Sequence, residues 1–185
     1  MKRASLLAGL LVWMLGTGAT AQSPSPEATD DWVALDHGRV AMPEFGFAVT
    51  FPDGWNVWEA RPDTSPTRVM AVGDDTCSVS EWWMAPDLSP FDSVDTWVTA
   101  YIDWARDEIP DYDVSGVMLD LDVGRVGRID LTRVESSQMG VKHGAKYLFS
   151  DGERWLALDC TSKTSLADDH WRSIAETFEF LSEND

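Results

Sequence analysis

The sequence has few of the residues from which catalytic and metal centres are usually built. Its 185 residues include three histidines and two cysteines, and it contains no Gly-x-Ser-x-Gly motif, no His-x-x-Glu-His-like cluster and no Cys-x-x-Cys pair. Such motifs hold a nucleophile or metal ligands at fixed spacings. With no catalytic residue to assign, we expect a protein that is not an enzyme, and a hydrolase is the least favoured alternative.

Positive charge is also scarce. The chain has 14 Lys and Arg residues against 32 Asp and Glu residues, which gives a formal net charge of −18. Like charges repel, so this balance argues against nucleic acid and anionic membrane surfaces as partners. The acidity is compatible with bound cations, with basic partners, or simply with high solubility.

Long apolar runs are absent except at the N-terminus, where Leu6–Leu15 follows two basic residues. This run is too short to span a bilayer and ends in the small-residue pattern Ala19-x-Ala21, which signal peptidase accepts. We therefore expect residues 1–21 to be a cleaved signal peptide. No cysteine lies near the cleavage point, so the sequence predicts a secreted or periplasmic protein without a lipid anchor.

Two segments of different composition follow the predicted cleavage point. Residues 22–38 begin with a polar, proline-containing stretch, which is typical of a flexible linker. Residues 39–183 are long enough to bury the core of one domain.

The two cysteines, Cys77 and Cys160, invite a disulfide in an oxidising compartment. In the predicted strands, Cys77 shares a face with Val79, and Cys160 shares a face with Leu158, so both thiols point into the core. The alternative is a pair of buried free thiols.

The order of expected elements indicates an α+β fold: a mostly antiparallel sheet packed with two helices. A helix is capped by Asp92 or Ser93 and ends at Pro110, and a shorter helix covers residues 166–175. The expected strands are 45–51, 55–58, 67–72, 76–84, 114–121, 126–133, 142–149, 155–161 and 178–181.

Three stretches in this order resemble a known family. They are Phe51-Pro-Asp-Gly-Trp55, the segment from Tyr147 to Trp155 that contains Ser-Asp-Gly-Glu, and the closing segment from Trp171 to Phe180. Together they resemble the PsbP-like superfamily, named for an extrinsic protein of photosystem II. The resemblance implies an αβα sandwich and a binding, assembly or accessory role, and it carries no catalytic motif onto this chain.

One local motif is similar to a calcium-binding loop. Asp111, Asp113, Ser115 and Asp122 place oxygen atoms at positions 1, 3, 5 and 12 of such a loop, and Gly116 stands at its turn. Position 12 is Asp instead of the usual Glu, and a strand is expected where the loop should lead into a helix. The alternative is a turn between helix and strand with solvated carboxylates.

Adjacent tryptophans offer a candidate binding surface. Trp82 and Trp83 send their rings to opposite faces of the expected strand. A ring left exposed would mark a surface for a ligand or partner, whereas helices on both faces would make both rings core residues.

These observations predict an exported, non-catalytic binding or accessory protein of the cell envelope, acting on an unidentified protein or small ligand. The alternative is a calcium- or carbohydrate-linked binding module, and no other cofactor is expected.

Overall fold

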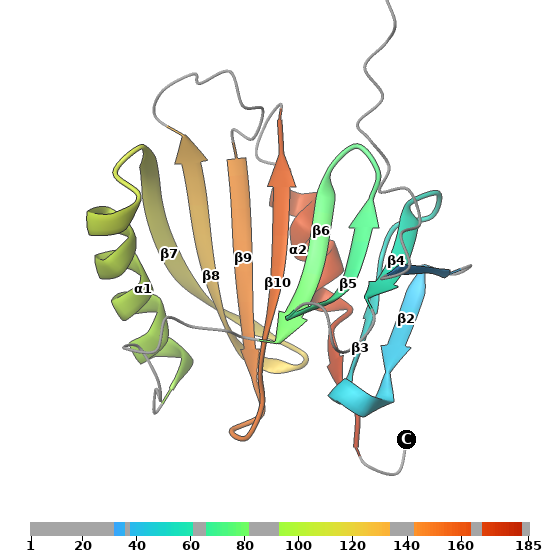
Figure 1. The fold of residues 1–185 in the computed structure, drawn as a ribbon. Coiled ribbons are helices and arrows are strands. Elements are labelled where there is room, and N and C mark those ends of the chain that lie inside the picture. Colours follow the sequence, from blue (N-terminus) through green and yellow to red (C-terminus); the bar gives the residue numbers. More distant parts are fainter. Residues whose placement is uncertain are drawn as a thin grey trace, which may run out of the picture.

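The structure is a computed structural model, and it describes residues 32–35, 38–60, 66–81, 93–133, 143–163 and 168–182. It confirms the α+β fold (Figure 1). The strands are β1 Trp32–Leu35, β2 Arg39–Met42, β3 Phe47–Thr50, β4 Asn56–Ala60, β5 Thr67–Val72, β6 Thr76–Glu81, β7 Tyr112–Leu121, β8 Gly124–Arg133, β9 His143–Ser150, β10 Trp155–Ser162 and β11 Glu179–Phe180. The helices are the 3-10 turn η1 Pro43–Phe45, α1 Val94–Glu108 and α2 Asp168–Glu176.

Eight strands form one antiparallel sheet in the order β1-β4-β5-β6-β10-β9-β8-β7. A smaller antiparallel sheet has the order β11-β3-β2. The chain order mixes hairpins with few long connections, as the sequence predicts. Strands β7 and β1 lie at the two edges of the large sheet.

Residues 32–35 correct the expected linker boundary. The sequence places them in the flexible segment 22–38, but they form β1, which pairs with β4 from Trp32 opposite Ala60 to Leu35 opposite Val57. Strand β2 was not predicted either. Both are four-residue strands, too short for a periodic pattern to stand out from the surrounding chain.

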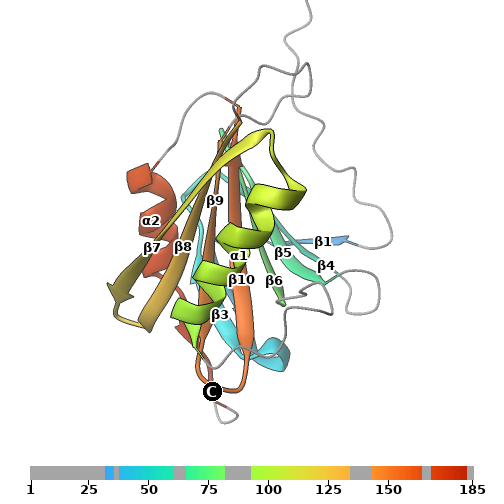
Figure 2. The same cartoon turned by 90° about the vertical axis from the view of Figure 1, so that its left-hand side faces the viewer.

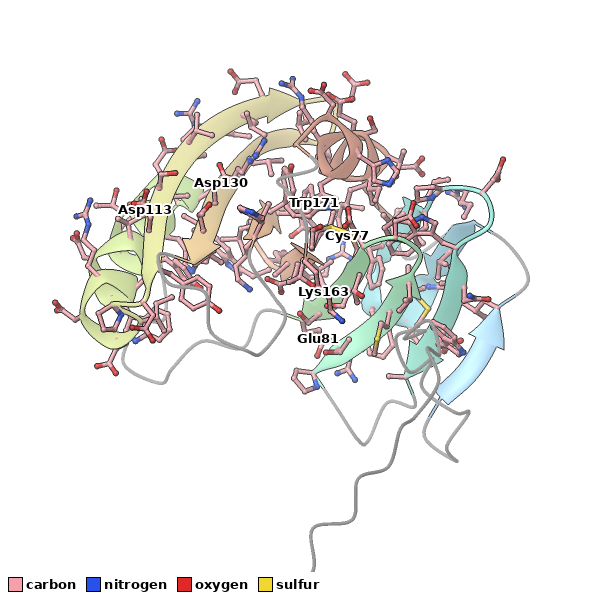
Figure 3. All side chains as sticks on the ribbon, turned by 90° about the horizontal axis from the view of Figure 1, so that it is seen from above. Cys77, Glu81, Asp113, Asp130, Lys163 and Trp171 are labelled. Atoms are coloured by element: carbon pink, nitrogen blue, oxygen red, sulfur yellow. A yellow bond between two sulfur atoms is a disulfide. The ribbon has the colours of Figure 1, made fainter. Side chains whose placement is uncertain are left out.

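Two hydrophobic cores lie on opposite faces of the large sheet. One contains α2, the small sheet and side chains such as Trp171, Phe178 and Phe149, whose ring is stacked on Phe178 at 3.9 Å between centroids. The Trp171 indole donates a hydrogen bond to Asp75 Oδ2 (2.8 Å), which ties α2 to the turn between β5 and β6. Figure 3 shows Trp171 and Cys77 close together in this layer.

The second core lies beneath α1 and includes the fully buried Trp97. Ser93 caps the helix as predicted, because its hydroxyl accepts a hydrogen bond from Thr96 N (3.2 Å). Gly127 in β8 permits close packing, since a Cβ atom there would lie 2.5 Å from Val98 Cγ2. Figure 2 shows α1 lying against this end of the sheet.

Among the described residues, no helix has both the length and the apolar character needed to cross a membrane.

Candidate binding pocket

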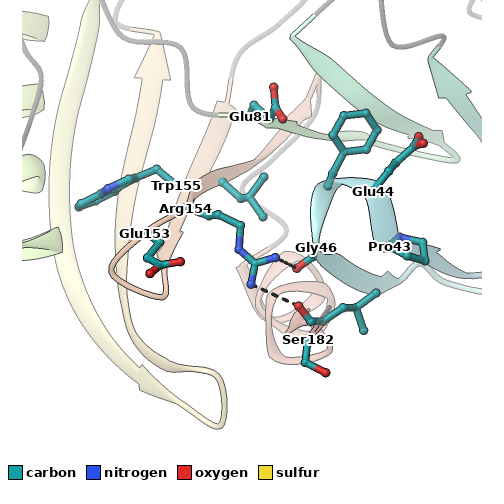
Figure 4. A pocket seen from close by; sticks show the side chains of 11 residues that line it. Pro43, Glu44, Gly46, Glu81, Glu153, Arg154, Trp155 and Ser182 are labelled. Carbon is teal, nitrogen blue, oxygen red and sulfur yellow. Dashed lines mark hydrogen bonds between the residues drawn. The ribbon is translucent and has the colours of Figure 1, made fainter. Parts of the chain in front are cut away.

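A pocket of about 710 Å³ opens at one end of the large sheet (Figure 4). It lies where η1, the end of β6, the β9–β10 hairpin and the residues after β11 meet. Its lining combines three carboxylates, one arginine and apolar surface: Pro43, Glu44, Phe45, Gly46, Glu81, Glu153, Arg154, Trp155, Leu156, Leu181 and Ser182. A concave, mixed lining of this kind is typical of ligand sites.

Arg154 holds the walls of this pocket together. Its Nη1 donates to the carbonyl of Gly46 (2.9 Å), and its Nη2 donates to the carbonyl of Leu181 (3.3 Å). The guanidinium also lies 5.3 Å from the centre of the Phe180 ring. Gly46 has φ 69°, and a Cβ atom there would lie 1.3 Å from Arg154 Nη1, so this position requires glycine.

Asp151 fixes the position of Arg154. Asp151 Oδ1 accepts hydrogen bonds from the backbone N–H groups of Glu153 (3.0 Å) and Arg154 (2.7 Å), and Oδ2 accepts one from Arg154 Nε (2.8 Å). Burial on its own would raise the pKa of the Asp151 carboxyl, but these backbone N–H groups and the guanidinium together lower it. The turn that contains Ser-Asp-Gly-Glu therefore holds the Arg154 side chain in position.

Of the three carboxylates that line the pocket, only Glu81 is paired with an arginine among the described residues. Glu81 accepts a hydrogen bond from Arg68 Nη2 (2.6 Å), and the Arg68 guanidinium lies 4.3 Å from the centre of the Phe45 ring. Glu44 and Glu153 are exposed and make no ion pair with another described residue. Because both nearby arginines already contact carboxylates, the pocket presents an excess of negative charge.

Trp155 connects this pocket to a second one of about 290 Å³ at the start of α1. The Trp155 side chain is half-buried and packs against the core beneath α1. In the second pocket, Arg125 donates two hydrogen bonds to Asp95 (2.8 and 2.7 Å), and the hydrogen bond from Arg125 is the main cause that lowers the pKa of Asp95. The arginine of this second pocket is therefore also paired with a carboxylate.

The structure does not bring the predicted calcium ligands together. Asp111 precedes β7, Asp113 and Ser115 lie on it, and Asp122 follows it. The ten-residue strand separates its two ends by roughly 30 Å. Ten paired positions with β8 hold this segment extended, so the four side chains do not form one coordination sphere. Within the described ranges, no group of three or more His, Cys, Asp or Glu side chains is arranged to hold a metal ion.

The predicted disulfide is confirmed. Cys77 in β6 and Cys160 in β10 stand directly opposite each other and are joined by an S–S bond, with both residues buried. The other predicted surface, Trp82 and Trp83, lies outside the residues that the structure describes. Sequence reasoning did not find the pocket around Trp155, because it depends on Gly46 meeting Arg154 across 108 positions of the chain.

Comparison with solved structures identifies a similar fold. The chain is similar to cyanobacterial PsbP (CyanoP) from Synechocystis sp. PCC 6803, with 12% identity, a TM-score of 0.55, and coverage of 87% of this chain and 99% of that one. A protein from Bacteroides thetaiotaomicron matches with 11% identity and a TM-score of 0.42, over 82% of this chain and 51% of that one.

No family model and no curated protein matches the sequence. At 12% identity, the likeness to CyanoP shows the fold alone, and that fold is PsbP-like.

Proposed function

We propose that this protein is an exported, non-catalytic binding or accessory protein of the cell envelope, and that the pocket beside Arg154 receives its partner or ligand. One observation carries the proposal: the pocket is open and prebuilt, its arginine is fixed by the fold, and Glu44 and Glu153 remain available at its rim. Fixed walls lower the cost of ordering a bound group. The excess negative charge favours a ligand or partner side chain that carries a positive charge.

Two further points support an exported binding role. The disulfide between Cys77 and Cys160 is of a kind that persists in oxidising compartments, which fits the predicted signal peptide in residues 1–21. The PsbP-like resemblance implies an accessory role.

The pocket hypothesis is testable by site-specific crosslinking in the cell envelope. A photoreactive amino acid replaces Glu44 at the pocket rim in the full chain, and a matched control carries it at the exposed Asp107 on α1. We expect a discrete crosslinked product from position 44 only. Adding Glu153→Lys should remove that product, because a positive charge then occupies the rim.

Equal products from positions 44 and 107, or a position-44 product that survives Glu153→Lys, would contradict this assignment. Export is tested separately by N-terminal sequencing of the protein recovered from the envelope. We expect the mature chain to begin at Gln22, and an unprocessed chain in the cytoplasm would overturn the export proposal.

A carbohydrate ligand is the second candidate, and Trp155 favours it. A half-buried indole shared by two pockets with polar rims offers a flat apolar face to a sugar ring. Titration of oligosaccharides, followed by tryptophan fluorescence, distinguishes the candidates. The carbohydrate ligand is favoured over a cationic one if oligosaccharides quench the fluorescence in a saturable way, and if this quenching is weaker in Trp155→Phe but unchanged in Glu44→Lys.

A further inference from the structure

The dipeptide Asp-Gly occurs twice in the sequence, once in the turn between β3 and β4 and once in the turn between β9 and β10. Aspartate rearranges most readily when glycine follows it, because glycine has no side chain to keep the carboxyl group away from the next backbone nitrogen. The same chemistry is therefore available at Asp53 and at Asp151, but the contacts around these two residues differ.

The rearrangement needs a carboxyl group and a backbone N–H that can meet. The glycine nitrogen attacks Cγ of the protonated aspartic acid, an N–Cγ bond forms, the nitrogen loses its proton, and the carboxyl hydroxyl leaves as water. Water then adds to the main-chain carbonyl carbon of the resulting succinimide ring, and the bond from that carbon to the nitrogen breaks. The product is isoaspartate, an isomer whose main chain runs through the side-chain carbon. Water is the only other reactant.

In the turn between β3 and β4, both groups are accessible. Asp53 and Gly54 are exposed, and neither the carboxylate nor the Gly54 N–H forms a hydrogen bond with another described residue. The space beside Gly54 is open, since a Cβ atom there would have no neighbour within 4 Å. Ring closure requires rotation about the Asp53 Cα–C bond, which is opposed by the hydrogen bond from Trp55 N to the carbonyl of Pro52 (3.2 Å) that closes the turn. No other described hydrogen bond within this turn opposes the reaction.

In the turn between β9 and β10, both groups are held. The Asp151 carboxylate accepts hydrogen bonds from the backbone N–H groups of Glu153 and Arg154 and from Arg154 Nε (2.7–3.0 Å). The Gly152 N–H donates to Ser150 Oγ (3.1 Å). Burial alone would raise the pKa of the Asp151 carboxyl, but its hydrogen bonds and the guanidinium lower it, so less of the reactive neutral acid is present. Attack here requires these contacts to break.

We propose that Asp53 is a site of spontaneous isoaspartate formation in the folded protein, and that the contacts which position Arg154 protect Asp151 from the same reaction. The modified turn joins β3 of the small sheet to β4 of the large sheet, and the added main-chain carbon would displace Trp55. The Trp55 ring lies 5.5 Å from the ring of His170 in α2, so the change would extend to this helix. The modification goes beyond the proposed function and does not depend on it.

The test ages the purified, oxidised protein at mildly acidic pH, where carboxyl groups are partly protonated, in water labelled with heavy oxygen. Peptide mapping with electron-transfer fragmentation locates isoaspartate, and ring opening by solvent leaves one heavy oxygen in the product. We expect isoaspartate to form at position 53 at least about tenfold faster than at position 151, since breaking one hydrogen bond to a charged group costs that factor or more.

The same chain aged in denaturant, with its disulfide reduced, is the control for local sequence. There the two positions should react within about threefold of each other, because the contacts of the folded turns are lost. Equal rates at both positions in the folded protein would overturn the proposal. So would a difference between the positions that is as large in the denatured chain, since it would then arise from the sequence and not from the fold.

Two variants test the chemistry at position 53. Asp53→Glu keeps the charge but would have to close a larger ring, so it should remove the product at this position. Asp53→Asn should form isoaspartate faster, because ammonia is then the leaving group. Both replace an exposed residue and should leave the fold intact. A product that persists in Asp53→Glu, or that carries no solvent oxygen in the unmodified protein, would contradict the proposed reaction.

Discussion

The centre and the outer edge of the large sheet differ in how many neighbouring strands each strand pairs with. At the centre, β6 and β10 lie side by side, have neighbours on both sides, and are joined by the buried disulfide between Cys77 and Cys160. At the edge, β7 has one neighbour and three consecutive exposed residues. The difference indicates that stability is concentrated in β6 and β10, whereas β7 has one backbone edge that pairs with no other described strand.

The largest expected loss of stability comes from removing the disulfide at the centre of the large sheet. Replacing Cys77 and Cys160 by alanine removes a crosslink across 83 positions of the chain, which is worth about 4.5 kcal/mol in the chain-entropy model. Denaturant unfolding of the double variant and the oxidised protein measures the difference. Equal unfolding free energies would show that the crosslink does not constrain the unfolded chain.

A smaller loss is expected where α1 meets the sheet. Gly127→Ala places a methyl group 2.5 Å from Val98 Cγ2 and 2.8 Å from Val94 Cγ1, and such overpacking costs about 1–3 kcal/mol. Ser115→Ala on the exposed part of β7 is the control and should change stability by less than about 0.5 kcal/mol. Thermal unfolding compares the two, and a similar loss in both would contradict the view that β7 is open.

The contribution of Asp151, in the turn between β9 and β10, to the stability of the fold should depend on pH. The lowered pKa of Asp151 means that its charged form stabilises the fold above the ordinary value of 3.8, and that this contribution is lost as the pH falls through the lower, folded-state pKa. Asp151→Asn should therefore be less stable than the unmodified protein near pH 6, by about 1 kcal/mol. The difference should shrink below pH 3.8, and a difference that is constant with pH would contradict this role.

The smallest expected effect concerns calcium. Because Asp111 and Asp122 lie at opposite ends of β7, we expect calcium and a chelator to give the same melting temperature. A ligand that binds only the folded state raises that temperature in a saturable way. A saturable rise abolished by Asp111→Asn would require a site that the described structure does not contain.

Local patterns predicted much of the fold. Alternation placed β5, β6, β9 and β10 to within a residue or two at most boundaries, and it put both cysteines on inward faces, where the disulfide is found. The helical spacing of Val94, Trp97 and Val98 identified the buried face of α1. These features depend on residues close together in the sequence, which is why they could be predicted.

The features that failed or were missed depend on pairing between distant segments. The calcium-loop pattern of residues 111–122 is local, but ten paired positions with β8 hold the same segment extended. The pocket arises because Arg154 reaches the carbonyls of Gly46 and Leu181, and no spacing in the sequence links these positions. The open edge of β7 likewise follows from strand order, which the sequence pattern did not determine.

Hydrogen–deuterium exchange at single amides of the exported, oxidised protein tests the contrast between centre and edge most directly. We predict that amides of β6 and β10 exchange only through global unfolding, whereas the amides of β7 that face away from β8 exchange by local solvent contact at much higher rates. Protection of those β7 amides equal to that of β10 would show that the edge is covered, and would contradict the contrast between centre and edge.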